Sequence, residues 1–264
     1  MNNSSDNKGK KILGYLFPGL ITLLVMLIVL VAKGIWPFGS SRIDLFDNMQ
    51  QVAPLYAHLW DAMHGDASIW FDWYTGLGTN VSMSMSAFSM ISPFNLFLYL
   101  CPRDYILEFI SVLTVIKTFV MSVTMYAFIN KRYNSLSYNI KALFAVAYAF
   151  CGYVLLYASC FTPWMDIVAL FPLLMMALDV MEKTGKKLFY IIMVAVMFII
   201  NYYLAAMSLV YILLVGGMYL IFMCDKKERR GKAWNVGIGT FTGIALSAFM
   251  LIPVFAQLSQ SQRT

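Results

Sequence analysis

Long apolar runs occupy most of the chain and are separated by short polar segments. A helix that spans a membrane needs about 20 mainly apolar residues. The runs that qualify are residues 12–32, 105–130, 142–160, 164–181, 188–203, 205–224 and 234–256. The pattern therefore predicts an all-α integral membrane protein with about seven transmembrane helices.

The first apolar run, residues 12–32, follows three lysines and in this respect is similar to a signal peptide. It is longer than the roughly 7–15 residues of a signal-peptide core, and no small-x-small cleavage site follows it. Lys33 follows it instead. We therefore expect an uncleaved first span, with residues 1–11 as a separate N-terminal segment.

The composition agrees with lipid as the main solvent. Hydrophobic residues make up 61% of the 264 residues and charged residues 12%, against roughly 25% charged residues in soluble domains. The formal charge of +6 lies in short clusters between the apolar runs rather than along one basic face, so no nucleic-acid partner is expected. The four cysteines have no C-x-x-C spacing, which argues against a disulfide framework or a zinc site.

The positions of the cations predict the orientation in the membrane. Fourteen of the nineteen lysines and arginines lie in the segments 1–11, 131–141, 182–187 and 225–233. Because cytoplasmic segments are enriched in Lys and Arg, these segments are expected inside, with a cytoplasmic N-terminus. Residues 105–256 then hold six further spans, and residues 257–264 lie outside.

This orientation places a long first loop, residues 33–104, on the outer side. Its apolar stretch 87–101 is short and is interrupted by Ser92 and Pro93, which favours a re-entrant or interface-lying segment over a span. Nearer the start of the loop, apolar residues recur at helical spacing and predict an amphipathic helix lying on the membrane. These residues are Val52, Leu55, Tyr56, Leu59, Trp60 and Met63.

Asp44 and Asp47 stand shortly after the first span at i, i+3 spacing, which puts both carboxylates on one face of a helix. A carboxylate at the membrane boundary can have a raised pKa and act as a general base. The alternative is a pair of solvated loop acids. Spacing alone leaves the two interpretations equal, and the amphipathic helix that follows favours the functional one.

Lys117 lies in the middle of the 105–130 run, where a charge costs on the order of 2.5–3.5 kcal/mol on insertion scales. Such a residue usually faces the interior of a helix bundle, so we expect it to hold a lipid phosphate or to pair with an acid. Snorkelling toward a membrane surface is the structural alternative, but both ends of the run are distant.

Other polar residues fall at the ends of the apolar runs. Asp166 and Trp164 begin the fourth run, and Asn201 and Tyr202 separate the fifth run from the sixth. Boundary anchoring and a tight turn explain these positions, and a functional role is the alternative.

The two histidines, His58 and His64, lie on or after the predicted amphipathic helix. Their spacing of six residues does not suit two metal ligands on one helical face, for which i, i+4 spacing is typical. Both are therefore expected at the surface, and the identity of any metal ligand is left open.

Several motifs, taken in order, resemble the YfhO family of bacterial membrane proteins. In the first loop they are DNMQQVAPL from Asp47, LWD from Leu59, SIWFDWYTGLGTN from Ser68 and SPFNL from Ser92. The likeness continues through Lys117, Trp164-Met165-Asp166, Asn201-Tyr202-Tyr203 and Leu251-Ile252-Pro253. It therefore covers nearly the whole chain.

The resemblance implies a multi-spanning glycosyltransferase architecture of the GT-C type. In that architecture an acid of the first outer loop acts near a sugar carried on a polyprenyl phosphate. Asp47 and Gln51 match the family's D-x-x-x-Q-Y pattern, whereas Val52 replaces the usual tyrosine. Asp47 is therefore the implied catalytic base, and Asp44 is the runner-up.

The resemblance also implies binding partners. Lys117 or Arg103 would steady the donor phosphate by charge. The candidates for a substrate cavity are Gln51, Trp164, Asp166, Asn201 and Tyr202. The implied partners are a polyprenyl-phosphate-linked sugar, an envelope-polymer acceptor such as a teichoic acid, and the lipid of a bacterial cytoplasmic membrane. No cofactor is specified, and a divalent metal is left open.

Family members are several times longer than this chain, which stops at Thr264 just after a seventh crossing. We therefore expect an N-terminal portion, a truncated gene or a separate half. Two other classes of function stay open. One is a transporter or flippase of lipid-linked envelope precursors, in which Lys117 and Asp166 belong to a substrate path, and the other is a non-catalytic assembly subunit. The long outer loop favours catalysis.

Overall fold

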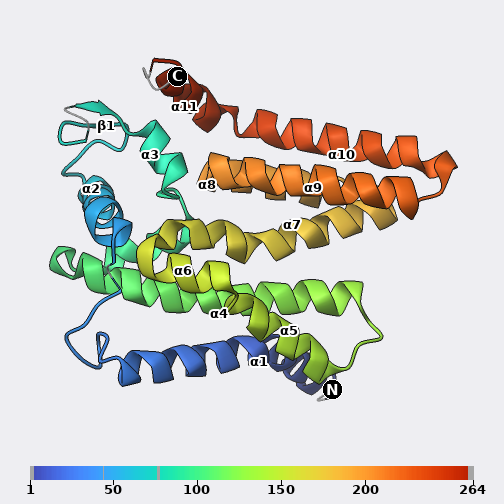
Figure 1. The fold of residues 1–264 in the computed structure, drawn as a ribbon, viewed down its shortest axis with the longest axis horizontal. Coiled ribbons are helices and arrows are strands. Elements are labelled where there is room, and N and C mark those ends of the chain that lie inside the picture. The colour runs from blue at the N-terminus through green and yellow to red at the C-terminus, as the bar shows by residue number, and fades with distance from the viewer. Residues whose placement is uncertain (1–2, 44, 76–77, 261–264) are drawn as a thin grey trace. The chain divides into compact units, whose positions relative to one another are not determined.

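The computed structural model describes residues 3–43, 45–75 and 78–260, and helices make up most of it (Figure 1). The chain divides into two compact units. The first consists of Met1–Ala57 and Phe97–Leu173, and the second of His58–Leu96 and Leu174–Thr264.

Three helices lie side by side in the first unit (Figure 1): α1 (Asn3–Ala32), α4 (Ile106–Arg132) and α5 (Tyr138–Ala149). A Cβ atom at Gly19 of α1 would lie 2.7 Å from a ring carbon of Phe119. Glycine at this position therefore lets α1 approach α4 closely.

The connecting elements of this unit are shorter. They are the π-helix η1 (Asn48–Val52), the 3₁₀-helices η3 (Arg103–Tyr105) and η4 (Thr162–Trp164), and α6 (Gly152–Cys160). Three elements continue from one unit into the other along the chain: α2 (Ala53–His64), η2 (Pro93–Leu100) and α7 (Met165–Thr184). The predicted run 142–160 is thus divided between α5 and α6, because the backbone at Cys151 is extended.

Helices also dominate the second unit, where α8 packs against α9 and α10, and α3 packs against α11. The helices are α3 (Ser82–Ala87), α8 (Leu188–Ile200), α9 (Tyr202–Phe222), α10 (Lys226–Leu246) and α11 (Ala248–Gln260). A short antiparallel hairpin joins β1 (Phe71–Asp72) to β2 (Thr79–Asn80), with Phe71 opposite Asn80. Strands of two residues are too short to show the alternating pattern that predicts a strand from sequence.

Within the described ranges, five helices are long and apolar enough to cross a membrane. They are Ile12–Ala32, Arg103–Arg132, Tyr138–Cys160, Thr162–Thr184 and Tyr202–Phe222. A sixth results if α10 and α11, which meet at a bend of 75°, form one broken span. The predicted fifth span shortens to the 13 residues of α8. An all-α membrane fold is confirmed at this level, whereas the count of seven and the orientation stay predictions.

The amphipathic helix predicted in the first loop is present as η1 and α2, and part of its apolar face is covered by protein. Val52 and Tyr56, on the predicted apolar face, have no exposed surface, and the Tyr56 ring lies 6.5 Å from the ring of Phe109 on α4. This part of the apolar face is therefore buried in protein rather than lying in lipid. The periodicity identified the face but not what covers it.

The apolar stretch 87–101 forms no helix of spanning length, as its interruption predicts. α3 ends at Ala87, and a 3₁₀-helix begins at Pro93. From within this 3₁₀-helix, the Asn95 amide donates to the Ser89 and Met90 carbonyls of the intervening segment over 2.9 and 3.1 Å. A buried side-chain amide thus satisfies carbonyls that a continuous helix would otherwise have bonded.

Gly243 provides a test of the α8–α10 packing. A Cβ atom there would lie 2.7 Å from Val194 Cβ and 3.0 Å from the Ile191 carbonyl oxygen. Gly243→Ala is therefore expected to lower the stability of the detergent-solubilised chain by about 1–3 kcal/mol, the usual cost of overpacking. Thermal unfolding followed by circular dichroism measures the loss.

Gly237→Ala is the matched control for this experiment. It lies on the same helix, and no described heavy atom outside its neighbours lies within 4 Å of the added Cβ. Alanine favours a helix interior over glycine, so this variant should be as stable as the wild type or more so. A loss as large as that of Gly243→Ala would contradict the packing.

Candidate functional site

Asp47 directly precedes η1, which continues without a break into α2. Its half-buried carboxylate accepts a hydrogen bond of 2.8 Å from the Gln51 side-chain amide one turn later. The structure thus joins the two residues that match the family pattern. Asp44, the other candidate base, lies outside the described residues.

Asn48, the next residue, is completely buried and fixes this segment to the end of α6. Its amide nitrogen donates to the carbonyls of Ser159 (3.0 Å) and Ala158 (3.4 Å). Its amide oxygen accepts from the Thr162 backbone N–H over 2.9 Å. Sequence reasoning missed Asn48, because a single asparagine in a loop has no pattern that separates it from a turn residue.

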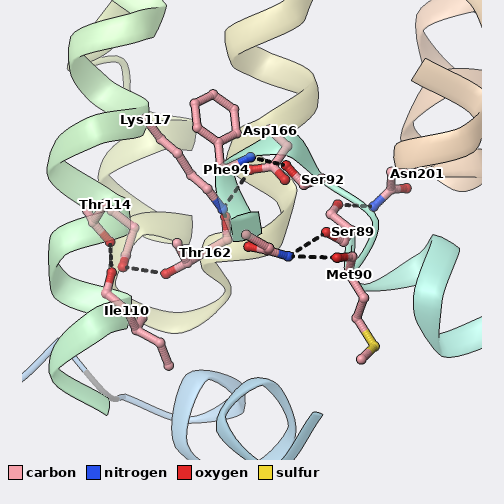
Figure 2. Close-up of polar contacts among 12 residues, drawn as sticks. Ser89, Met90, Ser92, Phe94, Ile110, Thr114, Lys117, Thr162, Asp166 and Asn201 are labelled. Atoms are coloured by element: carbon pink, nitrogen blue, oxygen red, sulfur yellow. Dashed lines mark hydrogen bonds and ion pairs between the residues drawn. The ribbon is translucent and has the colours of Figure 1, made fainter. Parts of the chain in front are cut away.

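Lys117 on α4 and Asp166 on α7 form a buried ion pair (Figure 2). The Lys117 Nζ lies 2.6 Å from Asp166 Oδ1, and both side chains are 0% exposed. Lys117 also donates to the Thr162 carbonyl over 3.2 Å. The interior position expected for Lys117 is therefore present, and snorkelling of Lys117 is wrong. Asp166 lies in the first turn of α7, at the start of the candidate span Thr162–Thr184, as the sequence predicts.

Thr162 connects these two sets of contacts through a single residue. Its N–H binds Asn48 and its carbonyl binds Lys117, and it lies in η4 directly before α7. Asn48, Thr162, Lys117 and Asp166 form a continuous series, which we call the polar chain. The series links the segment that carries Asp47 to two candidate spans, and all of it lies within the first unit.

Lys117 belongs to a polar face along α4. Four hydroxyl side chains recur along this helix at three- and four-residue spacing and are 0–1% exposed: Ser111, Thr114, Thr118 and Ser122. Thr114 and Thr118 donate to carbonyls of their own helix, at Ile110 and Thr114 respectively. This spacing of hydroxyls could have been recognised in the sequence, and it predicts that this face of α4 meets protein rather than lipid.

A second buried carboxylate lies at the start of α4. Glu108 Oε1 accepts a hydrogen bond of 2.8 Å from Arg42 Nε, and Glu108 is 6% exposed. Nearby, the Ile43 N–H donates to Ser111 Oγ over 3.2 Å. The stretch that leads to Asp47 is therefore fixed to α4 as well, through a glutamate that sequence reasoning missed.

The two cations proposed for the donor phosphate differ in exposure. Arg103 lies exposed in η3, directly before α4. Lys117 is buried against a carboxylate, so a phosphate would have to separate this ion pair to reach it.

Trp164 takes part in an aromatic cluster at the end of α6. Its ring lies 4.8 Å from the Tyr157 ring and 5.0 Å from the Phe161 ring. Trp164 and Tyr157 are half-buried. Thr162 lies between Phe161 and Trp164 in the sequence, so the aromatic cluster adjoins the polar chain.

Asn201 and Tyr202 belong to the second unit, where they make the tight turn that the sequence predicts. The Asn201 oxygen accepts from the Leu204 N–H over 3.0 Å and so caps α9. Its amide nitrogen donates to the Ala87 carbonyl over 2.9 Å. It also donates to Ser89 Oγ, as Figure 2 shows. The Tyr202 N–H donates to Ser86 Oγ. These contacts give both residues a structural role in the turn between α8 and α9.

The surface position predicted for His58 was wrong, whereas that of His64 is confirmed. The His58 side chain is 10% exposed, and its Nδ1 lies 3.8 Å from Asp72 Oδ1. Burial would raise the pKa of Asp72, but hydrogen bonds from Thr75 and Tyr74, together with His58, hold this pKa below its usual range. Across the described residues, no group of three His, Cys, Asp or Glu side chains could hold a metal ion.

The model of one protein family, described as bacterial membrane protein YfhO, matches residues 19–264. Neither a curated protein nor a solved structure matches the chain. The family match and the apolar helices agree, and they indicate a multi-pass membrane protein.

Proposed function

Since this chain belongs to the YfhO family of bacterial membrane proteins, we propose that it is a membrane glycosyltransferase or the N-terminal part of one. It would transfer a sugar from a polyprenyl-phosphate donor to a cell-envelope polymer such as a teichoic acid. The proposal extends the family's resemblance to GT-C enzymes to this chain, and the multi-pass helical fold supports it.

The observation that carries the proposal is the anchoring of the Asp47 segment. A general base must be held within hydrogen-bond reach of the proton that it removes, about 2.6–3.2 Å between heavy atoms. Asn48 is buried and binds two carbonyls in the last turn of α6 and the Thr162 N–H, so the residue next to Asp47 has one fixed position. A loop acid with no role beyond solubility would need no such support.

In the proposed reaction, Asp47 removes the proton of an acceptor hydroxyl. The hydroxyl oxygen bonds to the anomeric carbon, and the bond from that carbon to the polyprenyl phosphate breaks. The Gln51 amide binds Oδ1 of Asp47 and so orients the carboxylate. Arg103, which is exposed, would stabilise the departing phosphate by charge.

The proposed setting is a bacterial cytoplasmic membrane. The N-terminus and the cation-rich segments would face the cytoplasm, and the loop 33–104 would lie outside. The chain would cross the membrane seven times if α8 and the bent α10–α11 pair each complete a span. The donor sugar would then react at the outer face.

A transporter of lipid-linked envelope precursors is the second candidate. The buried pair of Lys117 and Asp166 favours it, because ionisable residues inside a membrane often mark the path of a substrate or proton. Such a protein would move the donor lipid across the membrane without breaking its glycosidic bond.

One assay separates the two candidates. Vesicles with and without the full chain receive polyprenyl phosphate carrying tritiated glucose, galactose or N-acetylglucosamine in turn, together with isolated teichoic acid. A glycosyltransferase moves the label into the polymer, which gel filtration detects. Movement of intact labelled lipid between leaflets, with no label in the polymer, would overturn the proposal in favour of transport.

A further inference from the structure

The end of α6 is a cluster of backbone acceptors. The last carbonyls of a helix have no partner within the helix, and the helix dipole makes this end partially negative. Here the Asn48 amide binds the carbonyls of Ala158 and Ser159, which belong to the last turn of α6. The Lys117 ammonium binds the Thr162 carbonyl two residues after the helix. An amide from one part of the chain therefore caps the end of α6, and a cation from another part binds the 3₁₀-helix η4 that follows it.

A completely buried charged pair calls for a reason other than stability. Replacing a buried ion pair by apolar residues of similar volume is often neutral or stabilising. Lys117 and Asp166 are both completely buried, so an apolar pair could join α4 to α7 equally well. An apolar side chain at position 117 could not, however, donate a hydrogen bond to the Thr162 carbonyl.

We propose that Lys117 is a positioning residue for Asp47. Asp166 compensates the charge of Lys117, Lys117 fixes the Thr162 peptide through its carbonyl, and the N–H of Thr162 fixes Asn48. The position of Asp47 thus depends on a charge inside the membrane span. The effect on catalysis rests on the proposed function, whereas the effect on the geometry of residues 45–52 does not.

Hydrogen exchange measures the positioning directly. The test compares the wild-type chain in nanodiscs with the neutral pair variant Lys117→Met/Asp166→Leu and with Thr124→Val. We expect the neutral pair to speed amide exchange at least tenfold in the peptides covering 45–52 and 158–164. Unchanged exchange in these peptides would overturn the inference.

Thr124→Val is the matched control. Thr124 Oγ1 donates to the Ala169 carbonyl over 2.9 Å, so it joins the same two helices, α4 and α7, without touching Thr162. Loss of this bond should leave exchange in the peptide 45–52 as in the wild type. Equal acceleration in both variants would show general loosening of the two helices and would also overturn the inference.

A second measurement separates positioning from general stability. Sugar transfer is measured for the neutral pair, for Asn48→Ala and for the combined variant. If Lys117 acts through Asn48, the neutral pair lowers kcat more than it raises KM, and adding Asn48→Ala lowers kcat no further. If the combined variant instead lowers kcat by the product of the two separate factors, Lys117 does not act through Asn48.

The two proposals fail in different ways. If the wild-type chain transfers no sugar, the proposed function fails, while the exchange data still decide whether Lys117 positions residues 45–52. If exchange accelerates and transfer is unchanged, the geometry stands and the catalytic consequence is overturned.

Discussion

Asp47→Asn is expected to reduce sugar transfer at least a hundredfold. An asparagine has nearly the same shape, and its amide oxygen can still accept the hydrogen bond from Gln51. What it lacks is the basic carboxylate, and general-base catalysis typically contributes about 10²–10⁴-fold to a rate. The measurement is the label in the envelope polymer, with the variants compared at equal abundance in the membrane.

Two further variants interpret this result. Asp104→Asn removes an exposed acid directly before α4 and should leave transfer unchanged. Asp44→Asn tests the runner-up base. Full activity in Asp47→Asn together with a large loss in Asp44→Asn would move the base to Asp44, and full activity in both would exclude a base at either position.

The apolar runs predicted most of the membrane-capable helices because a spanning helix must satisfy its backbone internally and be apolar along its whole length. Where the prediction failed, tertiary contacts decide. The run 142–160 is still one membrane-capable span, Tyr138–Cys160, despite the extended backbone at Cys151. The run 188–203, in contrast, ends early because Asn201 caps the next helix and binds the Ala87 carbonyl. A partner so distant in sequence cannot be inferred from a local pattern.

The candidate site was predictable to a similar degree. Lys117 was recognisable because a charge is costly within a span, and Asp166 was recognisable as an acid at the start of a run. Their pairing was not, since nothing in the spacing joins them. Asn48 and Glu108 were missed because their importance comes from burial and from distant partners. Asn48 binds a carbonyl at the end of α6, and Glu108 binds Arg42, and the sequence places neither partner.

The neutral pair variant should be more stable than either single substitution. Lys117→Met leaves the Asp166 carboxylate buried without its countercharge, and breaking a buried pair in this way costs about 3–5 kcal/mol. Asp166→Leu should cost a similar amount, because it leaves the Lys117 ammonium buried. Replacing both residues removes both charges, so the free energy of unfolding should return to near that of the wild type.

Unfolding in sodium dodecyl sulfate, followed by circular dichroism, measures these differences. Thr124→Val sets the scale for losing one buried hydrogen bond between α4 and α7, about 0.5–1.5 kcal/mol. A neutral pair as unstable as the single variants would mean that the ion pair itself stabilises the fold. Recovered stability combined with lost sugar transfer would mean that the charges serve the placement of Asp47, because stability alone could then be supplied without them.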